Sequence, residues 1–271
     1  MIKNCLFPVA GFGTRFLPVT KSIPKEMLPI LSKPLIHYSV QEATEAGINN
    51  FAIVLNKNKN AIKDYFSEYK ELDEILISNN KTNLIQSLNN IIDSCNFSYV
   101  NQTKMLGLGH AILQAENLLN GDPFGVILPD DLCFTDELSV LNQMVQIYKK
   151  NPQKNIIAVE EVDNSSIHKY GVIDGIEVDE DIYAVKGMIE KPLAKDAPSN
   201  LAIIGRYILQ PNVFGILKEI KPDMRGEVQI TDALNILAMK GEVLALKFKG
   251  KRIDCGSMEG YIEANNFLAS I

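Results

Sequence analysis

Apolar residues follow two alternating patterns through the first half of the chain. Short, nearly unbroken apolar runs at residues 5–10, 51–55, 97–102 and 124–131 predict buried strands. The segment 35–46 instead repeats apolar or small residues every three or four positions and is followed by glycine, which predicts a helix. The same reasoning places further helices at residues 61–69, 71–94, 109–119 and 136–150, the last with Leu138, Leu141, Val145 and Tyr148 on one face.

Strands that alternate with helices over residues 1–150 predict a mainly parallel sheet covered by helices on both faces. Beyond residue 150 the pattern changes, because strand-like runs follow one another with few helices between them. These runs predict a smaller β-rich subregion, inserted and partly antiparallel, at residues 155–162, 170–178, 182–192 and 201–209. Helices at 213–220 and 229–239, a strand at 242–250 and a helix at 258–270 complete a single α/β domain over residues 1–271.

One segment, residues 7–30, fits neither pattern. It combines four prolines with two glycines, and from Gly11 to Pro34 four basic residues face a single acid, Glu26. Glycines let backbone N–H groups approach phosphate oxygens, and prolines stiffen a loop. Arg15 offers a planar fork for phosphate, and Lys25 a point charge. The segment therefore predicts a polyphosphate-binding loop after the first strand.

Three other interpretations of this loop compete with polyphosphate binding. A dinucleotide-binding turn lacks its third glycine, because Phe16 occupies that position, and the following prolines prevent a helix from starting there. The spacing of a P-loop is missing. A stiff connector with incidental surface cations remains open, although the local excess of basic residues favours phosphate binding.

Composition narrows the classes of partner. A net charge of −6 disfavours a nucleic-acid surface, and no apolar run approaches the roughly 20 residues that span a bilayer. The N-terminal residues do not resemble a signal peptide. Four scattered cysteines and three histidines without metal-ligand spacing predict reduced thiols in a cytoplasmic protein and no zinc site.

Beyond these patterns, the loop G-x-G-T-R-x-x-P-x-T-K-x-x-P-K-E-M-L-P-I closely resembles that of bacterial UTP–glucose-1-phosphate uridylyltransferases. The resemblance runs nearly end to end and includes "QTKMLGLGHA", "VILPDD", "YGVIDG", "IEKP", "IGRYIL", "GEVQITDAL" and "DCGSMEGYIEAN". It implies a Rossmann-like nucleotidyltransferase fold. Residues 1–150 would bind mainly the nucleotide, and residues 151–271 would bind mainly the sugar and close the site.

The resemblance also implies an activity, the formation of UDP-glucose and pyrophosphate from UTP and α-D-glucose 1-phosphate with Mg²⁺. Catalytic roles fall to Arg15, Lys25 and Lys191. Nucleotide contacts fall to Ala10, Gly11, Gly13, Thr14, Gln102, Gly107 and Asp130. Sugar contacts fall to Gly171, Glu190, Lys191 and Gly205, and metal binding to Asp130 and Asp254.

The chemistry of these residues can be judged independently of the resemblance. Carboxylates at strand ends suit Mg²⁺, although paired acids such as Asp130 and Asp131 equally often cap a helix. The amide of Gln102 can donate and accept at once, as the imide edge of uracil requires. Glu190 and Lys191 are adjacent in a strand-like run, where neighbours normally point to opposite faces, so a surface ion pair is the alternative.

Rival functions remain to be separated. Glucose-1-phosphate thymidylyltransferase is the closest, and N-acetylglucosamine-1-phosphate uridylyltransferase is disfavoured because its hexapeptide-repeat extension is missing. A catalytically silent paralogue that regulates an active partner would be expected to lose its loop cations or acids, which this sequence keeps. We expect a cytoplasmic homodimer or homotetramer that binds neither nucleic acid nor membrane.

Overall fold

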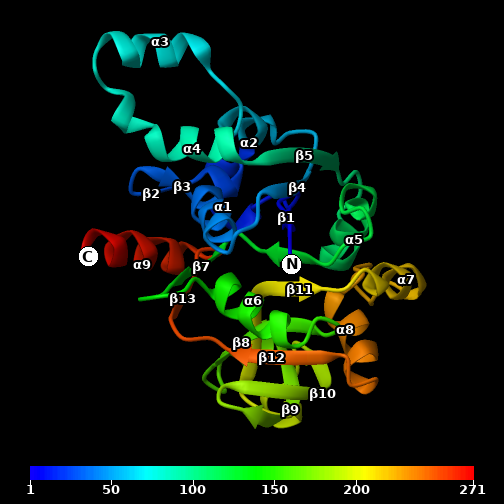
Figure 1. Cartoon of the computed structure of the whole chain (residues 1–271). Helices are drawn as coiled ribbons and strands as arrows, with labels where there is room; N and C mark the ends of the chain where they lie inside the picture. The colour runs from blue at the N-terminus through cyan, green and yellow to red at the C-terminus, as the bar shows by residue number, and fades with distance from the viewer.

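A nine-stranded mixed sheet runs through the whole molecule in the computed structural model, which describes residues 1–271 (Figure 1). Four of its eight neighbouring pairs are parallel, namely β5–β4, β4–β1, β1–β6 and β8–β12, and the other four are antiparallel. In spatial order the strands are β5 (Asn96–Asn101), β4 (Asn50–Leu55), β1 (Asn4–Pro8), β6 (Phe124–Ile127), β11 (Leu201–Leu209), β8 (Asn155–Glu161), β12 (Val243–Lys247), β10 (Ile182–Glu190) and β9 (Gly171–Asp179).

Helices cover both faces of this sheet because each turns an apolar face toward it. Apolar side chains of α5 (Gly107–Gln114), α7 (Asn212–Glu219) and α8 (Ile230–Met239) form one core with the strands. Those of α1 (Leu35–Glu45), α2 (Asn60–Tyr65), α4 (Gln86–Ser94) and α6 (Val140–Lys150) form a second core on the other face. The helix α3 (Lys70–Ser78) buries none of its residues and stands away from the body (Figure 1).

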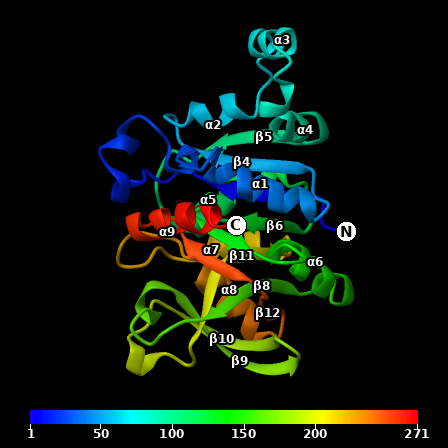
Figure 2. The ribbon, with the colours of Figure 1, turned by 90° about the vertical axis from the view of Figure 1, so that its left-hand side faces the viewer.

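A third, smaller core lies beside the main sheet. There α9 (Met258–Ala269) packs on the ribbon formed by β7 (Asp131–Phe134) and β13 (Lys251–Asp254), and on the short pair β2 (Pro29–Ile30) and β3 (Lys33–Pro34). Figure 2 shows α9 beside the loop that follows β1. No helix of the chain combines the length and the apolar character that crossing a membrane would need.

The predicted alternation of strands and helices in the first half is confirmed, with shifts at the boundaries. The helix expected at 71–94 is two helices, α3 and α4, and the strand expected at 124–131 already ends at Ile127. The helix expected at 136–150 begins only at Val140, because the Ser139 hydroxyl caps it, so Leu138 lies outside the helix and is exposed. Its predicted place on the helical face is therefore wrong.

One expectation about the sheet needs correction. The β-rich segment is not a separate insertion, because β8 and β11 are interior strands of the same sheet, and β10 and β9 lie at its edge. The mainly parallel sheet expected for residues 1–150 is confirmed, because β5, β4, β1 and β6 pair parallel in that order. Successive strands that lack intervening helices pair antiparallel, which explains why the second half differs.

Candidate active site

The loop after β1 is fixed in place by contacts at its base. Gly13 has a φ of +65°, and a Cβ there would come within 3.0 Å of the Lys25 side chain, so the close turn requires glycine. The carbonyl of Ala10 accepts a hydrogen bond from the Asn56 amide at 2.5 Å. Glu26 and Lys59 form a buried ion pair at 2.6 Å that ties the loop to the segment after β4. Lys25 is thereby held at a defined position.

Two cations of the loop meet two carboxylates beyond the strand ends. Lys25 Nζ donates to Asp130 Oδ2 at 2.5 Å, and Arg15 Nη1 donates to the carbonyl of Gly256 at 3.1 Å. Asp254 lies opposite Asp131 in the β7–β13 ribbon, and the Cys255 N–H donates to the Asp130 carbonyl at 2.7 Å. Lys25 and Asp130, which are 105 positions apart, therefore converge with Asp254, which follows Asp130 by 124 positions.

The cradle between the two carboxylates depends on Gly256. A Cβ at this position would lie 2.9 Å from Asp254 Oδ1 and 3.0 Å from Asp130 Oδ2. Any other residue would therefore fill the space that the two carboxylates face. The chain contributes no third Asp, Glu, His or Cys to a metal cluster here. Two carboxylates with room for phosphate and water oxygens fit Mg²⁺.

The two carboxyl groups differ in electrostatic environment. Burial alone would raise the pKa of Asp130, but the charge and hydrogen bond of Lys25, together with a backbone hydrogen bond and the charge of Arg15, outweigh burial, so the pKa lies below its ordinary value. Burial, reinforced by the charge of Asp131, raises the pKa of Asp254. The ammonium of Lys25 neutralises the carboxylate of Asp130, as a metal cation would, whereas no cationic side chain is bonded to Asp254. The two carboxylates, Asp130 and Asp254, therefore carry more negative charge than their bonded cation neutralises.

Gln102, which is predicted to contact the base, is buried. Its amide nitrogen lies 2.8 Å from His110 Nδ1 and 3.4 Å from the Gly107 carbonyl. Gly107 has a φ of +89°, and a Cβ there would come within 2.9 Å of the Val228 carbonyl, so glycine is required. His110 lies in the first turns of α5, as the sequence predicted. Gly11 and Thr14 are exposed on the same loop as Arg15.

Three of the residues predicted to bind the sugar lie together at the end of β10. The Thr231 hydroxyl donates to Glu190 Oε2 at 2.6 Å, and a Cβ on Gly171 would lie 3.2 Å from the same oxygen. Lys191 Nζ lies 3.4 Å from Glu190 Oε1. Lys191 has a φ of +48°, outside the strand, and this conformation brings both side chains together despite the alternation expected of a strand.

The structure does not bring Gly205 to that cluster. A Cβ on Gly205 would lie 2.6 Å from the Leu128 side chain and 2.8 Å from Asp131 Oδ2, and its N–H donates to the same oxygen. Close packing against the turn that carries Asp130 therefore accounts for this glycine. The residues predicted to bind sugar and the turn that carries Asp130 nevertheless lie near the same strand, β11. A Cβ on Gly171 would lie 3.2 Å from the Ile203 side chain, and Gly205, two residues further along, donates to Asp131.

Sequence reasoning missed two arginines that support these groups. Arg206 is 1% exposed, makes a bidentate ion pair with Glu42, and donates to the Leu128 and Asp131 carbonyls at 3.3 and 2.7 Å. Arg252 binds Asp131 and Glu160. Both lie in strand-like runs where an arginine gives no local sign of burial. Thr231 was also missed, although it lies in the motif "GEVQITDAL", one of those that carry the resemblance.

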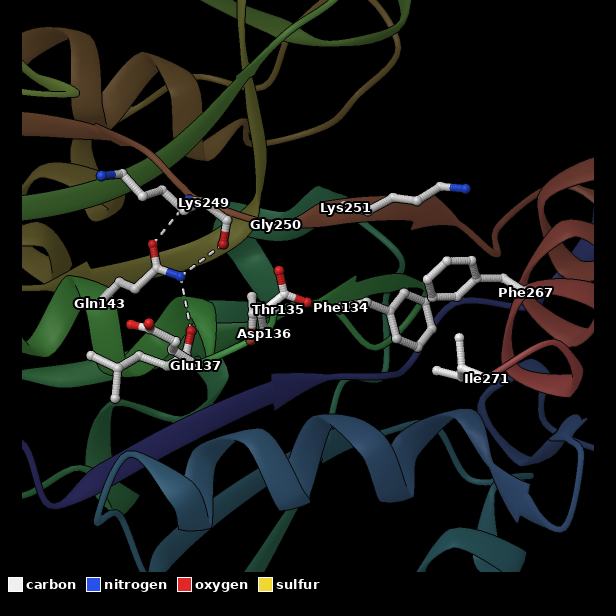
Figure 3. Close-up of a pocket in the computed structure, with 11 residues that line it drawn as sticks. Phe134, Thr135, Asp136, Glu137, Gln143, Lys249, Gly250, Lys251, Phe267 and Ile271 are labelled. Carbon is white, nitrogen blue, oxygen red and sulfur yellow. Dashed lines mark hydrogen bonds between the residues drawn. The ribbon is translucent and has the colours of Figure 1, made fainter.

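A pocket of about 920 Å³ opens at the other end of the β7–β13 ribbon, away from these groups (Figure 3). Its wall includes Phe134, Phe267 and Ile271, and the Gln143 amide crosses it to the carbonyls of Leu138 and Lys249 at 2.8 and 3.0 Å. None of the predicted site residues lines this pocket.

Comparisons with known proteins agree along the whole chain. Residues 9–271 match the nucleotidyl transferase family. A UTP–glucose-1-phosphate uridylyltransferase of Pseudomonas aeruginosa is 51% identical over 268 residues, which cover 98% of this chain and 96% of the relative. A solved UDP-glucose pyrophosphorylase in complex with UDP-glucose is 54% identical, with a TM-score of 0.93 over 100% of this chain and 99% of its own. A UTP-bound enzyme from Acinetobacter baumannii is 37% identical, with a TM-score of 0.91 over 99% of this chain and 93% of its own.

Proposed function

The chain belongs to the nucleotidyl transferase family, and we propose that it transfers the uridylyl group of UTP to α-D-glucose 1-phosphate, giving UDP-glucose and pyrophosphate. One observation carries this proposal in the structure. Arg15 and Lys25 converge with Asp130 and Asp254 around the Gly256 backbone, beyond the carboxyl ends of the parallel strands. Clustered cations and carboxylates suit a reaction between two polyanions.

The reaction needs charge neutralisation and alignment more than proton transfer. An oxygen of the glucose phosphate is already a competent nucleophile and attacks the α-phosphorus of UTP in line. The bond from that phosphorus to the oxygen bridging to the β-phosphate breaks, and pyrophosphate leaves with its electron pair. Arg15 and Lys25 neutralise the triphosphate, Lys191 orients the glucose phosphate, and no covalent enzyme intermediate forms.

Divalent metal is the cofactor we infer for this site, with Asp130 and Asp254 as its protein ligands. Mg²⁺ bound there would neutralise charge on the phosphate oxygens. The ammonium of Lys25 now neutralises Asp130 at 2.5 Å. We infer that this lysine moves its hydrogen bond from the carboxylate to the triphosphate when nucleotide arrives.

Recognition of base and sugar is assigned to the two flanking clusters. Gln102 would bond the imide edge of uracil, with the backbone of Ala10, Gly11 and Gly107 closing the base pocket. Its amide must then exchange the present contact with His110 for the base. On the sugar side, Glu190 would accept from glucose hydroxyls, and Gly171 lets the hexose lie against backbone because a Cβ would crowd Glu190. Gly13 and Thr14 are assigned to the phosphates.

Compartment and assembly belong to the same proposal. The cysteines at positions 5, 95, 133 and 255 are all free thiols, which supports a reducing compartment, and we assign the enzyme to the cytoplasm. We propose a homodimer or homotetramer.

A pyrophosphate-release assay tests the function directly. The full-length protein is incubated with Mg²⁺ and each pair drawn from four nucleoside triphosphates plus dTTP, and the 1-phosphates of glucose, galactose and N-acetylglucosamine. We expect UTP with glucose 1-phosphate to be the best pair. A preference for dTTP would identify a thymidylyltransferase, and no release with any pair would support the silent regulatory paralogue.

A further inference from the structure

Arg252 of β13 contacts three different elements with one buried side chain. Its guanidinium, whose side chain is 5% exposed, donates to Asp131 Oδ1 at 2.6 Å and to Glu160 Oε1 at 2.5 Å. Its third contact is the ring of Tyr170, whose centroid lies 4.9 Å from Cζ. Asp131 and Tyr170 lie 39 positions apart in the sequence and belong to the two sides of the site, so the arginine connects them.

The contact with Asp131 connects Arg252 to the proposed metal ligands. Asp131 follows Asp130 directly and lies opposite Asp254 in the ribbon. Its second carboxylate oxygen accepts the Gly205 N–H at 2.8 Å, so both oxygens are used in fixed contacts. Arg252 therefore helps to fix the position of the acidic turn.

The contact with Tyr170 connects Arg252 to the residues proposed to bind the sugar phosphate. The Tyr170 carbonyl accepts the backbone N–H of Lys191 at 3.0 Å, and Tyr170 directly precedes Gly171. Lys191 depends on this bond, because its φ of +48° is unfavourable for a residue with a side chain. A displacement of the Tyr170 ring would move the residue whose carbonyl holds Lys191, and with it the ammonium beside Glu190.

We propose that Arg252 is a positioning residue that couples the Asp130–Asp131 turn to the Tyr170–Lys191 segment, so that metal ligands and sugar-phosphate ligands hold a fixed relative geometry. The inference rests on the proposed function for the identity of the ligands. Arginine suits this place because its planar fork can bond two carboxylates while one face stacks on an aromatic ring, which a lysine ammonium cannot do. Glu160 anchors the fork to β8 in the main sheet.

The test uses the full-length protein carrying Arg252→Lys, which keeps the charge but loses the fork. Affinity for UDP-glucose is measured by calorimetry in EDTA, Mn²⁺ binding in the presence of UDP-glucose by electron paramagnetic resonance, and UTP affinity in EDTA by calorimetry. We expect UDP-glucose and Mn²⁺ each to bind about 10- to 100-fold more weakly, as is typical for partners of metal ligands. UTP affinity in EDTA should stay within about twofold of wild type.

Matched variants separate coupling from general damage. Lys251→Ala changes the neighbouring residue of the same strand, whose ammonium pairs with Glu263, and should leave all three affinities unchanged. Tyr170→Ala should reproduce the Arg252→Lys pattern, whereas Tyr170→Phe keeps the ring and should restore both affinities. If Arg252→Lys fails to fold, the comparison of Tyr170→Ala with Tyr170→Phe tests the coupling instead.

Each outcome is decisive. A lower unfolding temperature of Arg252→Lys with unchanged UDP-glucose and Mn²⁺ affinities would reduce Arg252 to a structural ion pair. Weaker binding of UDP-glucose alone, or of Mn²⁺ alone, would also overturn the proposed coupling. A wild-type protein that binds neither UTP nor UDP-glucose would contradict the proposed function itself, which is a different result from either.

Discussion

The two ends of the β7–β13 ribbon differ in how their charged side chains are arranged. At the Asp131–Asp254 end, carboxylates, Lys25, Arg15 and Arg252 converge on one small cradle, and the ion pairs there are as short as 2.5 Å. At the Phe134–Lys251 end, a pocket of about 920 Å³ is bordered by charged side chains that point apart (Figure 3). The Lys249 side chain is 72% exposed.

Pocket volume alone would favour the Phe134–Lys251 end as a site, whereas the interacting charges favour the Asp131–Asp254 end, which we propose to be the reactive end. Exposed charges are screened by water and contribute little, whereas charges that share a partly dry cradle interact strongly and shift one another's pKa. Asp130 and Asp254 show such shifts at the Asp131–Asp254 end, whereas the shift at the pocket end is a raised pKa of the exposed Lys249 ammonium, caused by its surface partner Glu180. Carboxylates at the two ends of the ribbon should therefore respond very differently to the same substitution.

The largest expected effect comes from removing a carboxylate at the reactive end. Asp130→Asn and Asp254→Asn should each lower the rate of pyrophosphate release on the order of 100-fold or more, because metal-assisted charge stabilisation is worth several kcal/mol. The control is Glu137→Gln, which changes a carboxylate lining the pocket in Figure 3 and should leave the rate unchanged. Near-normal activity of both aspartate variants at ordinary Mg²⁺ levels would show that the metal site lies elsewhere.

A smaller effect is expected on the sugar side of the same end. Lys191→Ala should raise the KM for glucose 1-phosphate about 10- to 100-fold, because a charge-assisted contact is worth roughly 1.5–3 kcal/mol. UTP affinity, measured by calorimetry, should change little. Arg15→Ala should show the reverse pattern, with UTP and pyrophosphate weakened. Equal loss of UTP affinity in Lys191→Ala would remove its assignment to the sugar phosphate.

The base pocket tests whether buried polar contacts also set specificity. CTP presents a ring acceptor and an exocyclic donor where UTP presents an imide, so it leaves buried groups mispaired at about 1–3 kcal/mol per group. The ratio of kcat/KM for UTP over CTP should therefore fall in Gln102→Ala. His110, which lies beside Gln102, provides a control. His110→Ala should lower turnover less than the aspartate substitutions do, because the reaction requires no histidine base. An unchanged ratio would exclude Gln102 from base recognition.

The smallest effect is expected at the pocket end. Gln143→Ala removes the amide that joins α6 to the carbonyls of Leu138 and Lys249 (Figure 3). Hydrogen bonds of this exposed kind contribute roughly 0.5–1.5 kcal/mol, so the unfolding temperature should fall by a few degrees. Pyrophosphate release should be unaffected. A loss of activity comparable to that of Asp254→Asn would mean that the two ends are coupled after all.

The sequence predicted well where a local pattern suffices. Helix α1 follows from its apolar spacing and the glycine after it, and the loop after β1 from its glycines and prolines. The pairing of strands that are distant in the sequence could not be predicted from a local pattern. Nothing near Asp254 indicates that it pairs with Asp131, and β12 carries no sign that it lies between β8 and β10.

Side-chain environments were the least predictable part of the site. Arg206 and Arg252 follow ordinary strand patterns, yet each is buried by partners that are distant in the sequence, such as Glu42 and Glu160. The glycine at position 205 could be read equally as a substrate contact or as a packing requirement. Only the three-dimensional neighbours Leu128 and Asp131 distinguish the two.

The position of β12 has a consequence for protein synthesis. This strand, at Val243–Lys247, joins β8 to β10 in the sheet, although both partners are completed more than 50 residues earlier in the chain. A ribosome adding about 5–20 residues per second leaves these strand edges unpaired for several seconds. Unpaired edges invite association between nascent chains, so this half of the protein should depend on chaperones while it is being synthesised.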